Sequence, residues 1–135
     1  MPNKALNIAP VIFSFLLFAG CSTDHQEVDQ LASESLQLLK AKKYEEAIEL
    51  LLHPDHLAEI AAKNNISLSE IVIEFSTSNK PAQLEKKIEL ALQQKPVVNE
   101  DCTELFFQFD RKYLSELGAK PLKFKKIDGR WWLLN

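Results

Sequence analysis

The sequence predicts an α+β fold in which N-terminal helices pack on a C-terminal antiparallel sheet that ends in an Asp-Gly hairpin. Apolar residues recur at helical spacing before Pro96, whereas they alternate with polar residues after it. Asp128-Gly129, a dipeptide preferred in two-residue hairpin turns, separates the last two apolar segments. The 135 residues are enough for one domain, which we place at residues 29–135.

The first two predicted helices are defined by apolar periodicity and by a proline. Residues 28–39 place Val28, Leu31, Ala32, Ser35, Leu38 and Leu39 on one helical face. The second helix covers residues 44–52 and ends near His53, because Pro54 disfavours helical backbone in the residue before it.

Pro54 can itself open the third helix, which Asn64-Asn65 ends. Ser67 and Glu70 have the spacing of a capping box and start the fourth helix. Residues 76–80 are expected to form a loop, and a fifth helix runs from Pro81 towards Pro96.

The remaining chain has strand patterns. Residues 103–109 alternate in polarity and predict a strand, and a short helical turn at residues 112–117 ends at Gly118. The two-residue turn then fixes a hairpin register in which Ile127 lies opposite Arg130. One hairpin face should pack on the helices; it holds Leu122, Phe124, Trp131 and Leu133, with Lys126 near the turn. The opposite face, which we call the basic hairpin face, holds Lys123, Lys125, Arg130, Trp132 and Leu134.

The charge is unevenly distributed. The whole chain has 16 basic and 19 acidic residues, but residues 22–110 hold eight Lys and 17 acids, whereas residues 111–130 hold seven basic residues and two acids. We expect no nucleic-acid partner, because an overall acidic chain lacks the electrostatic footprint for one.

The amino terminus has the pattern of a signal peptide: Lys4 is followed by an uncharged apolar run that is too short to span a bilayer. Phe18-Ala19-Gly20-Cys21 at its end resembles the lipobox of bacterial lipoproteins. The resemblance implies a signal peptide at residues 1–20, cleavage between Gly20 and Cys21, and lipidation of Cys21. It also implies a membrane partner through the lipid anchor, and Ser22 favours the outer membrane with the domain facing the periplasm. Residues 21–28 would be the lipidated cysteine and a polar tether.

The layout of the mature chain resembles small secreted lipoproteins of the nuclear transport factor 2-like type. The likeness rests on Tyr44-Glu45-Glu46-Ala47, on the segment at residues 95–101 and on the final Asp-Gly-Arg-Trp turn. It implies a curved sheet wrapped by helices, whose interior can bind a small molecule, act as an enzyme or serve only as an interaction module. A minor alternative is a tetratricopeptide-like helical scaffold, which residues 41–48 followed by Pro54 resemble.

Few residues suggest chemistry. His53 and His56 could bind a metal but are better explained as helix-boundary residues, because structural zinc needs further ligands. If Cys21 carries lipid, Cys102 is a lone thiol, better explained by packing than by redox chemistry. Asp110 is the best candidate for a general base, although a helix-capping role explains it more simply. We predict no cofactor, metal site or catalytic residue, since no phosphate loop, nucleophile elbow or dinucleotide fingerprint is present.

Two functions follow as hypotheses. The first is a lipid-anchored envelope protein that acts as a non-enzymatic module and binds an unknown envelope protein or ligand. Its candidate surface is the basic hairpin face with Lys123, Lys125, Arg130 and Trp132, since clustered cations around an amphipathic ring suit anionic partners. A neighbouring segment that covers this face is an equally good explanation. The second is a small-molecule binder or hydrolase that uses the interior of an incomplete cone.

Overall fold

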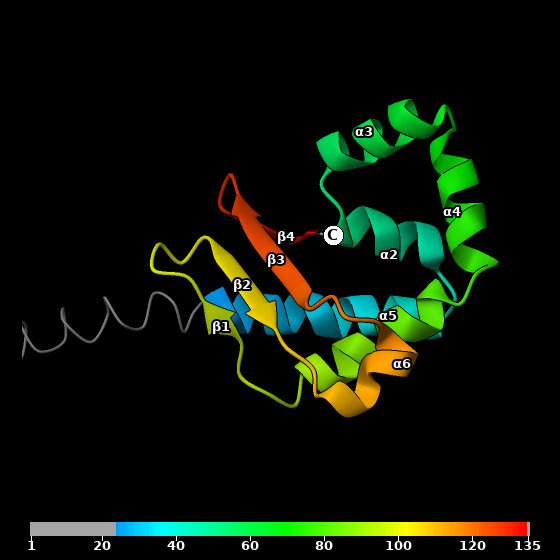
Figure 1. The fold of residues 1–135 in the computed structure, drawn as a ribbon. Coiled ribbons are helices and arrows are strands. Elements are labelled where there is room, and N and C mark those ends of the chain that lie inside the picture. Colours follow the sequence, from blue (N-terminus) through cyan, green and yellow to red (C-terminus); the bar gives the residue numbers. More distant parts are fainter. Residues whose placement is uncertain (1–23, 135) are drawn as a thin grey trace, which may run out of the picture.

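The computed structural model describes residues 24–134 and has the predicted α+β architecture (Figure 1). A helix at residues 24–40, the N-terminal helix, precedes the other helices and a four-stranded sheet. The helices are α2 (Tyr44–Leu51), α3 (Pro54–Asn64), α4 (Leu68–Ser76), α5 (Lys80–Ala91) and, after the second strand, the short turn η1 (Arg111–Tyr113) and α6 (Leu114–Leu117). The strands are β1 (Val97–Val98), β2 (Glu104–Phe107), β3 (Leu122–Ile127) and β4 (Arg130–Leu134). The proposed signal peptide and the lipobox, Phe18 to Cys21, lie outside the described residues.

The helix ends follow the predicted stop and start residues. His53 precedes α3, and its Nδ1 accepts a hydrogen bond from the Asp55 N–H at 3.0 Å, so the boundary role of His53 is confirmed. Asn65 ends α3 in the left-handed conformation with φ of 52°. Ser67 Oγ accepts a hydrogen bond from the Glu70 N–H at 3.2 Å and caps α4.

The sheet is antiparallel throughout, with the order β1-β2-β3-β4. The hairpin has the predicted register, with Ile127 opposite Arg130 and Phe124 opposite Leu133. Asp128 and Gly129 have φ of 53° and 79°, and two positive values are what a type I′ turn requires.

The predicted strand at residues 103–109 is shorter in the structure, at Glu104–Phe107, and pairs with the unpredicted strand β1. Asn99 explains its start, because Asn99 Oδ1 accepts hydrogen bonds from the N–H groups of Thr103 and Glu104 and ties both into the turn. A strand of two residues such as β1 is too short to show alternation in the sequence.

The hydrophobic core lies between the sheet and the N-terminal helix, which crosses behind the strands in Figure 1. Leu105, Phe107 and Phe124 are at most 1% exposed, and the rings of Phe107 and Phe124 meet edge to face at 6.4 Å. The hairpin face with Leu122, Phe124 and Trp131 therefore packs on the helices as predicted.

Residues 24–28 form the main departure from the prediction. They are helical, Val28 is fully buried, and Asp24 is only 7% exposed. Asp24 Oδ1 accepts hydrogen bonds from Lys126 Nζ at 2.8 Å and from Trp131 Nε1 at 3.4 Å. The prediction of a tether that reaches Val28 is therefore wrong for residues 24–28, because contacts with the distant hairpin order this polar segment. Within residues 24–134, no helix combines the length and the apolar character needed to cross a bilayer.

Candidate functional site

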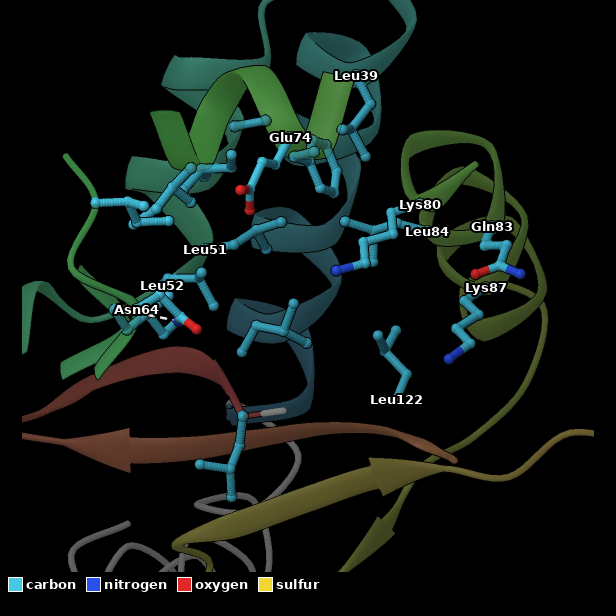
Figure 2. A pocket seen from close by; sticks show the side chains of 18 of the residues that line it. Leu39, Leu51, Leu52, Asn64, Glu74, Lys80, Gln83, Leu84, Lys87 and Leu122 are labelled. Carbon is cyan, nitrogen blue, oxygen red and sulfur yellow. Dashed lines mark hydrogen bonds between the residues drawn. The ribbon is translucent and has the colours of Figure 1, made fainter. Parts of the chain in front are cut away.

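A cavity of about 490 Å³, which we call the main cavity, lies between the helices and one end of the hairpin (Figure 2). The N-terminal helix, α2, α3, α4, α5, β3 and β4 all contribute side chains to it. Of its 19 lining residues 14 are apolar, among them Leu39, Leu51, Leu84 and Leu122. Its volume lies within the range of roughly 300–1,000 Å³ that is usual for small-molecule sites.

Five polar side chains complete the lining: Asn64 from α3, Glu74 from α4, and Lys80, Gln83 and Lys87 from α5. Figure 2 shows Glu74 on the α4 side of the cavity and the two lysines on the α5 side. No ion pair within 4.0 Å joins Glu74 to either lysine in the described structure. A cavity with apolar walls and separated polar groups suits an amphipathic ligand.

Lys87 is the half-buried cation of this lining. Burial lowers the pKa of its ammonium group below the ordinary value, and the nearby charge of Lys120 lowers the pKa further. The neighbouring Gln83 side chain donates a hydrogen bond to the Glu116 carbonyl at 3.2 Å, which links α5 to α6. The α5 side of the cavity is therefore electropositive and structurally fixed.

A second cavity of about 420 Å³ lies between α2, α3 and α4, and its lining is apolar except for Glu49. The two cavities share Leu52 and Ile71, whereas Leu57 lines only the second and Leu84 only the main cavity. Neither α3 nor α4 has a buried residue. The second cavity lacks a lysine, so the two cavities differ in charge.

The four residues predicted as an interaction surface have two different environments in the structure. Lys125 is exposed, and Lys123 forms an ion pair of 3.3 Å with Glu104. Arg130 and Trp132 instead contact each other, with the guanidinium 3.6 Å from the ring centroid. The basic hairpin face is therefore not one continuous cationic surface.

Residues at the end of α2 and the start of α3 contact the Arg130 and Trp132 end of that face, and Arg130 stays exposed. Arg130 Nη2 donates a hydrogen bond to the Leu50 carbonyl at 2.7 Å, and the His53 and Trp132 rings meet edge to face at 5.0 Å. Trp132 Nε1 is buried and has no hydrogen-bond acceptor among the described residues. Contacts that pack Arg130 and Trp132 against α2 and α3 give both a structural role.

Asp110 is exposed and lines neither cavity. It precedes η1, where its backbone carbonyl accepts a hydrogen bond from the Tyr113 N–H at 3.0 Å, while its side chain makes no capping bond. The sheet interior is filled by Phe107, Phe124 and Trp131. This geometry does not favour Asp110 as a general base, which would need a pocket that excludes water.

Cys102 lies in the loop before β2 with φ of 55° and is disulfide-bonded. The prediction of a lone, packed thiol at Cys102 is therefore wrong for this structure. The sequence has one other cysteine, Cys21, which lies outside the described residues. A sulfur atom that carries a lipid thioether cannot also form a disulfide, so lipidation of Cys21 excludes a disulfide between Cys21 and Cys102.

Sequence reasoning did not find the main cavity, because seven elements that are distant in the chain contribute to it. Apolar side chains that line a cavity and apolar side chains that fill a core give the same helical periodicity. Among residues 24–134, no group of three or more His, Cys, Asp or Glu residues is placed to hold a metal ion.

A scan against protein-family models and searches of curated proteins and solved structures found no match. The lipobox and the likeness to nuclear transport factor 2-like lipoproteins therefore stay predictions from the sequence.

Proposed function

We propose that the protein is a lipid-anchored protein of the bacterial envelope whose domain is a non-enzymatic module that binds a small apolar or amphipathic molecule. The main cavity carries this proposal. Ligand sites are concave and mostly apolar, with a few polar groups that orient the ligand. The main cavity has this character, because buried side chains such as Leu39 and Leu51 line its apolar part and exposed polar residues such as Glu74 lie at its solvent-facing side.

The chemistry of the lining favours binding over catalysis. The residues that line the main cavity include no Ser, Thr, Cys or His, and its one carboxylate, Glu74, is exposed. Covalent and acid–base catalysis require a nucleophile or base with a catalytic partner beside it, and Lys87, the lining group with a lowered pKa, has no carboxylate within 4.0 Å among the described residues. The polar groups here can orient and hold a ligand.

The lipid anchor is supported by the lipobox pattern and by the position of Asp24. Two residues lie between Cys21 and Asp24 in the sequence, and the three Cα-to-Cα steps span at most about 11 Å of extended chain. Because Asp24 is held to Lys126 and Trp131, acyl chains on Cys21 would keep the hairpin end of the domain at the bilayer surface.

Ligand binding is tested by purifying the full chain from membranes, extracting it with organic solvent and identifying co-purified small molecules by mass spectrometry. Leu84→Trp fills the main cavity, and Leu57→Trp is the matched control because it makes the same change in the second cavity. We expect a compound with the wild type and Leu57→Trp that is lost from Leu84→Trp. The same extract from all three proteins would contradict the proposal, provided that thermal melting shows all three folded.

Lipidation is tested separately. Cells that produce the chain are labelled with an alkyne fatty acid, and the wild type is compared with Cys21→Ala. We expect label on the wild type alone, and equal label on both proteins would refute a lipid anchor at Cys21.

A second candidate function, partner binding through the sheet, is favoured by one observation. Val97 is 50% exposed on the same sheet face as the exposed Lys125, and both lie away from the helix-covered core face. After cross-linking in membranes, the charge reversal Lys125→Glu should lose a partner that the matched variant Lys63→Glu keeps. Equal recovery with both variants would reject this surface.

A further inference from the structure

The charge around the main cavity indicates what kind of ligand it takes. Lys80 and Lys87 stand seven residues apart on α5, so both lie on one helical face about 10 Å from each other. Neither lysine has an ion-pair partner within 4.0 Å in the part of the chain that the structure describes. With Glu74 as the single carboxylate, the lining has a net charge of +1.

The two lysines differ in their surroundings. Lys80 is exposed, whereas Lys87 is half-buried and has the cation Lys120 nearby. A half-buried ammonium group beside a like charge is destabilised electrostatically unless an anion joins it. Figure 2 shows the Lys87 ammonium on the α5 side of the cavity, away from the Glu74 carboxylate on α4.

The apolar part of the lining requires that the ligand also has a hydrocarbon part. The cavity is walled by Leu39, Ile48 and Leu51, and Leu122 and Leu133 close it on the sheet side. A small inorganic anion would leave these walls exposed to water, whereas a hydrocarbon chain would cover them.

We infer that the main cavity binds a single-chain anionic amphiphile, with its hydrocarbon chain along the leucine-lined wall and its carboxylate or phosphate head on Lys87. This inference rests on the proposed binding function and names its ligand class. Lys120 adds positive charge at the head-group end. Glu74 repels the head group and so directs it towards α5.

The test is photolabelling of the purified full chain in phosphatidylethanolamine vesicles. Three probes with the same diazirine-bearing chain are compared: a fatty acid, its neutral methyl ester and a lysophosphatidic acid. Labelled peptides are mapped by mass spectrometry. We expect both anionic probes to label cavity residues, with the stronger label identifying the natural head group, and the methyl ester to label them roughly tenfold less.

Charge variants at matched positions sharpen the test. Lys87→Glu should reduce cavity labelling by the anionic probes roughly tenfold or more, and Lys87→Arg should retain it because the positive charge is kept. Lys63→Glu, an exposed change on α3 outside both cavities, should have no effect.

Three outcomes are distinguishable. Equal labelling by ester and acid, insensitive to Lys87→Glu but lost in Leu84→Trp, would overturn the anionic ligand and leave the proposed binding function standing. Labelling by any probe that is confined to residues outside the main cavity would overturn the inference. Failure of the proposed function itself would appear as identical co-purified compounds from the wild type and Leu84→Trp.

Discussion

Asp24→Ala should destabilise the domain strongly, although this residue lies only three positions after Cys21. The variant removes the acceptor of the Lys126 hydrogen bond at 2.8 Å and of the Trp131 N–H at 3.4 Å. A hydrogen bond between charged groups contributes about 1.5–3 kcal/mol, and a buried donor without an acceptor costs about 1–3 kcal/mol. Because the Lys126 side chain is 32% exposed, we take a lower total of about 2–4 kcal/mol.

The assay is chemical and thermal unfolding of the full chain, followed by tryptophan fluorescence and circular dichroism. At roughly 4 °C per kcal/mol for a domain of this size, Asp24→Ala should lower the Tm by about 8–16 °C. Asp24→Asn keeps an acceptor for the Trp131 N–H and should lose about half as much. Asp110→Ala is the matched control, because Asp110 is exposed and its side chain makes no capping bond. A Tm for Asp24→Ala equal to that of Asp110→Ala would refute the packing of residue 24 and support the original prediction of a polar tether there.

The same contact gives a pH dependence with a definite sign. The hydrogen bond to Asp24 raises the pKa of Lys126 above its ordinary value of 10.5, and the charges of Asp24 and Glu27 act in the same direction against desolvation. Since the folded state binds this proton more tightly than the unfolded state, the stabilisation is fully present below pH 10.5. The stability difference between wild type and Asp24→Ala should therefore be constant near neutral pH and shrink as pH rises above that value.

Two further predictions concern the hairpin. Arg130→Ala should lower the free energy of unfolding in urea by about 1–2 kcal/mol, because the variant loses the backbone hydrogen bond and the ring contact of Arg130. Lys125→Ala should change the free energy of unfolding by less than about 0.5 kcal/mol, and equal effects of the two variants would contradict a structural role for Arg130. Gly129→Val should lower the free energy of unfolding by about 1–3 kcal/mol through backbone strain alone, because φ is +79° and a Cβ would meet no atom within 4 Å. An unchanged Tm would contradict a type I′ turn.

The hairpin and the helix ends could be predicted because local chemistry determines them. Asp128-Gly129 fixes the strand pairing through its turn type, and Pro54 and Asn65 mark helix boundaries through their backbone preferences. These features depend on neighbouring residues, which the sequence displays directly.

The remaining features depend on contacts between distant residues. Asp24 belongs to a polar segment typical of a linker, and it is ordered by Lys126 and Trp131, more than a hundred positions away. Strand alternation places Trp132 on the outer sheet face, but His53 of the α2–α3 connection packs against its ring. A candidate surface that is derived from strand alternation alone takes no account of the segments that pack over it.

The central claim is that the main cavity binds an anionic amphiphile, and a methyl NMR titration tests it most directly. The full chain, with labelled leucine and valine methyl groups and held in nanodiscs, is titrated with palmitic acid. We predict shifts at Leu51, Leu84 and Leu122, which line the main cavity, with Leu57 and the exposed Val97 unchanged. Shifts confined to Leu57 or Val97, or no shift at the three cavity leucines, would contradict the claim.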